Sequence, residues 1–298
     1  MYLKLIKYLL FIFLIFISLS TYSITTCNSI VNIQQIKSEK DLLIKSLLAL
    51  SLSKTAPEMC ISESSYKMSI SRQQLQVEND QLDVLWTSAD LKDSLSPIRI
   101  PIFKGFLGYR LLVIRQGGQV VFNRINSLTD LKDFTAGLGR YWGDTLILFQ
   151  AGIPMITTQA GDRLWEMLAN KRFDYFPLAI HEPWEELNAR SKLNLTTEKN
   201  ILLSYPSGLY FHVNKSNVKL FNLISSGMKL AVKDGSYNKL IQQSTMIKNT
   251  VKFANIAQRK LIKLDNKALI ENTPKENLKY WLTHKELISF IEQAKSYH

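Results

Sequence analysis

Short apolar segments alternate with amphipathic segments from residue 28 onward, and this alternation constrains the fold more than any other feature. Residues 28–35, 60–64 and 82–88 have the composition of strands. The segments between them, 38–54 and 69–80, space their apolar residues as on one face of a helix. Strands that are joined through helices run parallel in one sheet. The order therefore predicts an α/β fold with a parallel-rich sheet and helices on both of its faces.

Two longer extended segments, 108–115 and 201–213, enclose a middle region that has an α/β pattern of its own. A chain that leaves one lobe and returns to it must cross between the lobes twice, and these segments are the candidates for the two crossing strands of a hinge. The sequence therefore predicts two lobes, with residues 24–112 plus 206–298 in the first and residues 113–205 in the second.

The N-terminus has the order of regions found in a secretory signal peptide. Lys4 and Lys7 precede an unbroken apolar run at 8–17, and small polar residues follow. We expect residues 1–23 to be removed and the mature chain to reside in the periplasm. An uncleaved anchor is one alternative, because the run is only a little shorter than the ~20 residues that span a bilayer. A lipoprotein modified at Cys27 is the other.

The two cysteines, Cys27 and Cys60, each lie where a strand is expected to begin. If those strands are adjacent and parallel, a disulfide can join their starts in an oxidising compartment and contribute roughly 3–4 kcal/mol. Two free buried thiols are the alternative. The cysteines form no Cys-x-x-Cys motif and have no metal-type spacing with histidine, so we expect no metal site.

The chain carries a formal net charge of +12, which raises the question of nucleic-acid binding. The lysines are spread singly, however, and no run of four or more basic residues occurs. With an export signal in addition, we expect no nucleic-acid partner. A basic surface favours anionic ligands only weakly.

The sequence contains no complete enzyme signature. "HEPWE" at 181–185 is similar to the zinc-binding HExxH helix, but Pro183 would break that helix and Glu185 stands where the second histidine belongs. Three Ser-x-x-Lys matches lack the accompanying motifs, and the glycines of 137–143 have the wrong spacing for a dinucleotide site. We therefore expect no catalytic residues, no cofactor and no enzymatic activity.

The segment 137–145 is the first candidate for ligand contact. A strand delivers the chain to Arg140, and a helix begins near Trp142. An arginine at such a position offers a bidentate donor to a carboxylate, and Tyr141 and Trp142 add flat stacking surface. Alternatively, the aromatic rings pack on the neighbouring lobe and Arg140 pairs with a surface acid.

A second candidate lies at the end of the first-lobe strand 82–88. Trp86 and Thr87 occupy the carboxyl edge of the predicted sheet, where such folds bind ligands, and Lys92 follows at the next turn. The alternative is a core tryptophan followed by a helix cap. Further on, Arg99 alternates with isoleucines, so it either lines a cleft or faces solvent on an edge strand.

The segment "RFDYFPLAIHEPWEE" is dense in chemistry, but its pattern predicts a strand at 172–176 that runs out to the edge of a cleft and turns into a helix. Asp174 is then expected to be structural. Phe176, Leu178 and Glu182 remain as candidates for ligand contact, as parts of a binding wall rather than a reaction centre.

The order of these segments resembles that of the family-3 extracellular solute-binding proteins over nearly all of the mature length. "SLTDLKDFTAGLGRYWGDT" is similar to the family's entry into its second lobe, and "MLANKRFDYFP" is similar to its Gly-Arg-x-Asp strand. "SPIRIPIFKGFLGYRLLVIR" and "LSYPSGLYFHVNK" look like a proteobacterial subgroup. The resemblance implies a type II periplasmic-binding-protein fold whose interlobe cleft closes on a small solute. It also implies a monomer that serves a membrane transporter or sensor.

The sequence departs from the amino-acid-binding members at two positions. Lys92 falls near the site of an arginine that clamps the ligand carboxylate, so Arg99 or Arg140 would have to take over. Where those members place an acid for the ligand's ammonium group, residues 177–179 are apolar, and no acid follows until Glu182. The expected ligand is small and anionic or amino-acid-like. A dehydratase-like enzyme on this scaffold and a partner-interaction protein without solute are the alternatives.

Overall fold

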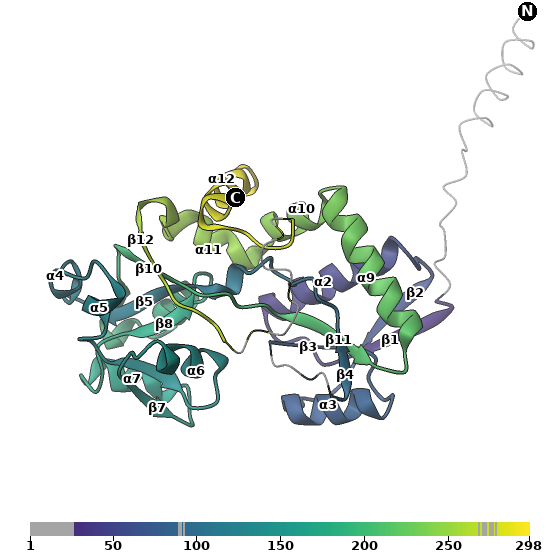
Figure 1. The fold of residues 1–298 in the computed structure, drawn as a ribbon, viewed down its shortest axis with the longest axis horizontal. Coiled ribbons are helices and arrows are strands. Elements are labelled where there is room, and N and C mark those ends of the chain that lie inside the picture. The colour runs from purple at the N-terminus through teal and green to yellow at the C-terminus, as the bar shows by residue number, and fades with distance from the viewer. Residues whose placement is uncertain are drawn as a thin grey trace, which may run out of the picture.

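The computed structural model describes residues 27–88, 91, 93–267, 269, 273, 277 and 279–298. The predicted signal peptide and Lys92 lie outside these residues. Within the described part of the chain, no helix has both the length and the apolar character that a membrane span requires. The chain forms two bodies of sheet and helix, joined by extended segments (Figure 1).

The first lobe contains a sheet whose first half is parallel, as the alternation of strands and helices predicts. β1 pairs with β2 in parallel, and a bridge between Ile33 and Val84 continues the sheet toward β3. β11 then inserts antiparallel between β3 and β4, so the C-terminal half of the chain completes the first sheet. The strands are β1 (Ser29–Ile33), β2 (Met59–Glu63), β3 (Leu85–Thr87), β4 (Leu95–Pro97) and β11 (Tyr210–Asn214).

Helices from both ends of the chain cover the first lobe. α2 begins after Ser38, whose hydroxyl caps the helix by accepting a hydrogen bond from the Asp41 amide at 3.1 Å. α9 packs closely on α2 because Gly227 lies at the contact, where a Cβ atom would be 1.9 Å from the Ser51 carbonyl oxygen. The helices are α2 (Glu39–Ser53), α3 (Ile70–Glu78), α9 (Val218–Lys233), α10 (Ser236–Gln242), α11 (Thr245–Phe253) and α12 (His284–Ala294).

The second lobe is built around β5, which pairs antiparallel with β8, β9 and β10. β6 and β7 form a parallel pair that a bridge between Ala136 and Tyr175 joins to this sheet. The strands are β5 (Tyr109–Arg115), β6 (Ala136–Gly139), β7 (Met155–Thr158), β8 (Phe176–Ala179), β9 (Leu195–Thr197), β10 (Ile201–Ser204) and β12 (Lys260–Lys263). The helices are α4 (Gln119–Phe122), α5 (Leu128–Leu131), α6 (Gly143–Gln150), α7 (Arg163–Ala169) and α8 (Pro183–Ala189).

β12 lies in sequence between the helices α11 and α12, and it pairs in parallel with β10. The predicted boundaries place it in the first lobe, whereas its hydrogen bonds put it in the sheet of the second. In the described residues the chain thus passes between the lobes before β5, between β10 and β11, and again before β12. The hinge region therefore has more connections than the two crossing strands that the sequence predicts.

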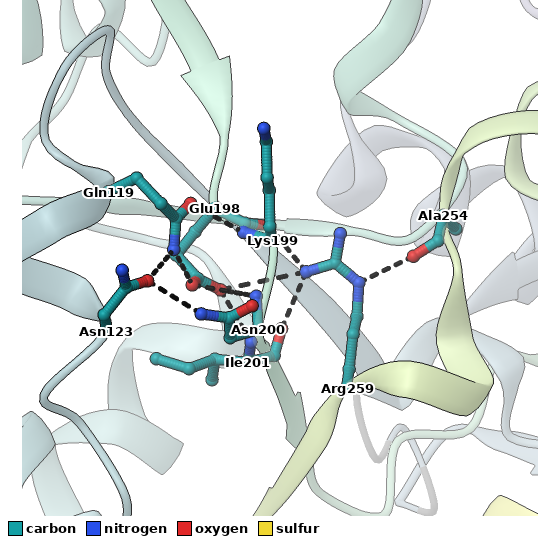
Figure 2. Close-up of polar contacts among 8 residues, drawn as sticks. All are labelled: Gln119, Asn123, Glu198, Lys199, Asn200, Ile201, Ala254 and Arg259. Carbon is teal, nitrogen blue, oxygen red and sulfur yellow. Dashed lines mark hydrogen bonds and ion pairs between the residues drawn. The ribbon is translucent and has the colours of Figure 1, made fainter.

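Arg259, just before β12, fastens this strand to the second lobe (Figure 2). Its guanidinium donates hydrogen bonds to the carbonyl oxygens of Ala254 at 2.6 Å, Glu198 at 2.6 Å and Ile201 at 3.1 Å. The carboxylate of Glu198 is fully buried, 3.8 Å from the guanidinium, and accepts hydrogen bonds from the amides of Asn200 and Ile201. Burial lowers the pKa of Arg259 to about 10, and Glu198 opposes this effect.

The predicted disulfide is present between Cys27 and Cys60, whose Cα atoms are 5.5 Å apart. Cys27 precedes β1 and Cys60 belongs to β2, its parallel neighbour, as the sequence predicts. The cross-link therefore fixes the outer edge of the first sheet, close to the point where the described chain begins.

Candidate functional site

A cleft with a volume of about 1360 Å³ lies between the two lobes. The first lobe contributes Lys40 from the start of α2, Ile70 from the start of α3, and Thr87 from the end of β3. The second lobe contributes the start of α6 and the end of β8. The volume exceeds the roughly 300–1,000 Å³ of typical small-molecule sites, so the cleft is wide enough for a sizeable solute.

Arg110, the second residue of β5, lies at the floor of this cleft. Its Nε donates a hydrogen bond to the hydroxyl of Tyr205 at 2.8 Å, and its Nη2 donates one to Asp144 at 2.8 Å. Its Nη1 lies 3.9 Å from the carboxylate of Glu182. Arg110 and Tyr205 belong to the chain segments that cross between the lobes, and Asp144 stands in the first turn of α6, where an acid is favoured. The floor thus sits at the hinge.

The charged groups on the floor stabilise one another in their ionised forms. Burial opposes the charged form of Arg110, but Asp144, Tyr205 and Glu182 outweigh it and raise the pKa of the guanidinium above its ordinary value. Burial likewise works to raise the pKa of Glu182, yet His181, Arg110 and Lys40 together hold that pKa below its ordinary value. The floor therefore combines two cations, Lys40 and Arg110, with two carboxylates, Asp144 and Glu182.

His181 lies behind the floor and does not line the cleft. Its side chain is only 8% exposed, its ring centre lies 6.2 Å from that of Phe106, and its Nε2 is 3.9 Å from Oε1 of Glu182. Burial lowers the pKa of His181 to about 4. An enzyme on this scaffold would need an acid and a base that both face the cleft, and of this pair only Glu182 does so.

Aromatic rings form the second-lobe wall of the cleft. Trp142 stacks on Phe176 with ring centres 5.7 Å apart, and Trp165 meets the same ring edge-on at 5.2 Å. Gly139 makes room for this stack, because a Cβ atom there would be 2.4 Å from the indole of Trp142. Trp142 therefore packs within its own lobe and is held as a fixed surface.

Seven of the ten residues predicted to contact ligand lie on the cleft. Arg140 is exposed there and forms no ion pair with any residue that the structure describes. Contact between these seven residues and a ligand stays a prediction. The seven are Thr87, Arg140, Tyr141, Trp142, Phe176, Leu178 and Glu182.

Two further predicted residues, Trp86 and Arg99, do not line the cleft. Trp86 is buried, and its indole N–H donates to Asp41 at 3.3 Å, because alternate side chains of β3 face opposite sides and this one faces the core. Arg99 lies half-buried and acts electrostatically on Tyr210. Lys92 lies outside the described residues.

The strand predicted at 172–176 is displaced, since β8 begins at Phe176 and runs to Ala179. Asp174 explains the shift: its carboxylate accepts a hydrogen bond from the amide of Thr135 at 2.8 Å and lies 3.5 Å from Arg115. These contacts fit the structural role predicted for Asp174. They hold the chain in a turn, and the strand that reaches the cleft starts after it.

The sequence reasoning missed Arg110, Asp144, Tyr205 and Lys40. A signal for Arg110 was present, because it stands second in a strand whose next four residues are all apolar. A charge in such a strand requires a partner or a function. Asp144 and Lys40 looked like ordinary helix-start residues, and nothing local indicated that the fold would bring them to one floor.

No protein-family model matches the chain, and no curated protein matches it in sequence. Solved structures do match. The protein YckB of Bacillus subtilis matches with 17% identity and a TM-score of 0.51, over 80% of this chain and 96% of that one. An ancestral arginine-binding protein bound to arginine matches with 14% identity and a TM-score of 0.50, over 73% and 97%. A Salmonella typhimurium periplasmic binding protein with high arginine specificity matches with 13% identity and a TM-score of 0.50, over 72% and 99%. This chain therefore has the two-lobed fold of the periplasmic binding proteins.

Proposed function

We propose that this chain is a periplasmic solute-binding protein of the family-3 type, which captures a small ligand in the cleft between its lobes. The observation that carries the proposal is the charged floor, where Arg110 and Tyr205 from the crossing segments meet Asp144 and Glu182 from the second lobe. Charged groups held together at a hinge are suited to sensing whether the cleft is filled.

The mechanism would be hinge closure. First-lobe residues such as Lys40 and Thr87 line the cleft together with second-lobe residues such as Arg140 and Trp142. A solute that touches both sets gains contacts only when the lobes close. Its affinity for the closed state is therefore higher, and this difference shifts the population toward that state.

Arg140 is the proposed anchor for an anionic or amino-acid-like ligand. The guanidinium of Arg110 is already bound to Tyr205 and Asp144, so its donors are less available. Arg140 is exposed on the cleft and can offer two parallel N–H groups to a carboxylate. Glu182, partly exposed on the floor beside Arg110, would suit an ammonium group.

The N-terminal signal pattern and the Cys27–Cys60 disulfide both fit an oxidising compartment outside the cytoplasm. In the periplasm the protein would work as a monomer, by binding rather than catalysis, and would present its solute to a membrane transporter or sensor.

Native mass spectrometry of the exported protein, purified without refolding, tests the proposal. We expect a small anionic or amino compound to co-purify and to be released on denaturation. In titrations with that compound, Arg140→Ala should weaken binding about tenfold or more, since one charge-assisted contact contributes roughly 1.5–3 kcal/mol. The matched control is Arg124→Ala, an exposed arginine away from the cleft, which should bind as the wild type does. Unchanged affinity in Arg140→Ala would refute this choice of anchor.

A further inference from the structure

The walls of the cleft, in addition to its floor, indicate which class of solute would bind there. We infer that the solute is amphiphilic: a small carboxylate head, with or without an α-amino group, attached to an aliphatic or aromatic body. This inference rests on the proposed function, because it specifies the class of solute for the same cleft.

The first observation concerns α6. Leu146 and Phe149 are three residues apart, so they share one face of the helix, and both line the cleft. Leu146 is 47% exposed and Phe149 is 69% exposed, whereas Ile147 and Leu148 between them are buried in the second-lobe core, with Ile147 also reaching the edge of the cleft. The core therefore does not need Leu146 and Phe149. They present apolar surface to the cleft and leave it uncovered.

The second observation is that this surface continues beyond α6. Tyr141, 79% exposed, precedes the helix, and the stack of Trp142 on Phe176 follows along the same wall. Across the cleft, the first lobe places Ile70, 45% exposed, on the opposite side. We use the name apolar wall for five residues of the second lobe: Tyr141, Trp142, Leu146, Phe149 and Phe176.

The third observation is the separation of polar from apolar groups. The ionised groups of the floor, Arg110, Asp144 and Glu182, interact with one another. The apolar wall carries no charge of its own, and Arg140 stands at its beginning. A compact hydrophilic solute would satisfy the floor and Arg140 but would leave the wall in water. Exposed contiguous apolar surface on a monomer usually marks a place where something binds.

The size of the cleft agrees with a body of this kind. At about 1360 Å³ it has room for a solute much larger than a polar headgroup. Burying the hydrocarbon of such a solute against Leu146 and Phe149 would remove apolar area from water on both partners, which is favourable in proportion to that area. The head would give orientation, and the body would supply much of the affinity.

A homologous series of ligands tests the inference. The probes are acetate, butyrate, hexanoate and octanoate, and their 2-amino derivatives glycine, 2-aminobutyrate, norleucine and 2-aminooctanoate, titrated by calorimetry. In the series that binds, we expect affinity to rise by up to roughly fourfold for each methylene added. The double variant Leu146→Ser/Phe149→Ser should lose most of this dependence on length while it keeps the affinity for the shortest ligand that binds.

The matched control is Val120→Ser/Val121→Ser, which removes two equally exposed apolar residues from α4, away from the cleft. It should keep the full dependence on length, and both variants should unfold at similar denaturant concentrations. Arginine, glutamine and glutamate separate the two proposals. If these polar solutes bind and affinity does not rise with chain length, the amphiphile inference is wrong and the solute-binding function stands; the apolar wall then meets only the first lobe on closure. If no compound of any set binds, both proposals fail.

Discussion

The burial of the His181 ring makes the free energy of unfolding depend on pH. Because burial lowers its pKa to about 4, the folded protein keeps the ring neutral at pH values where the unfolded chain, with a pKa near 6.5, already takes up a proton. The free energy of unfolding should therefore be unaffected by this group above pH 6.5 and fall as the pH decreases from about 6.5 to about 4. The total loss is about 3 kcal/mol.

His181→Gln checks this pH dependence, because glutamine has a polar side chain that does not titrate. Urea unfolding, measured at several pH values between 7 and 4, should show a shallower fall in stability for the variant than for the wild type. Curves of equal slope would mean that His181 is not the group that responds.

At the same scale, some site residues could be predicted from sequence and others could not. Arg140, Tyr141 and Trp142 precede a helix that follows a strand, and this local pattern places them at a sheet edge. Trp86 faces the core, and sequence alone could not show this, because a strand of three residues leaves the inward and outward faces undecided until its neighbours are known. Arg110 could be singled out as a charge in an apolar strand, but its partners Tyr205 and Asp144 lie 95 and 34 residues away, and no local pattern reports those contacts.

Among the elements, β12 depends most on contacts that are distant in sequence. Arg259 donates to three main-chain carbonyls and lies against the buried Glu198 (Figure 2). Arg259→Met removes those donors and leaves the Glu198 carboxylate buried without its cation. The expected loss in the free energy of unfolding is about 3 kcal/mol or more.

Chemical denaturation measures that loss, with Lys263→Met as the control. Lys263 lies at the exposed end of the same strand, so its substitution should change the unfolding midpoint little. Equal midpoints for the two variants would show that β12 is held by its pairing with β10 alone.

Element prediction succeeded where the signals are local. The helices expected at 38–54 and 69–80 are present as α2 and α3, because the spacing of apolar residues that indicates each helix lies within the segment itself. β12 was missed for the opposite reason. Its four residues are a weak pattern by themselves, and they become a strand because Arg259 and β10 hold them there.

For the whole molecule, the alternation of strands and helices sufficed to predict two α/β lobes, since that order admits few arrangements of the chain. It did not predict how often the chain crosses between them. α11 shows why: it contacts α2 in the first lobe, and its Thr250 hydroxyl donates to the carbonyl of Ile180 at 2.9 Å, next to the cleft floor. α11 is therefore part of the hinge because of the residues that it contacts. Its sequence by itself shows only that the helix has an apolar face.

The central claim, that solute is held between the lobes, is tested most directly by amide hydrogen exchange. Mass spectrometry would compare the protein as purified with solute and the same protein after the solute has been removed. The account predicts slower exchange with solute at 138–146 and 176–182 in the second lobe, and also at 86–88 in the first. Protection confined to one lobe, or found only away from these segments, would contradict capture in the cleft.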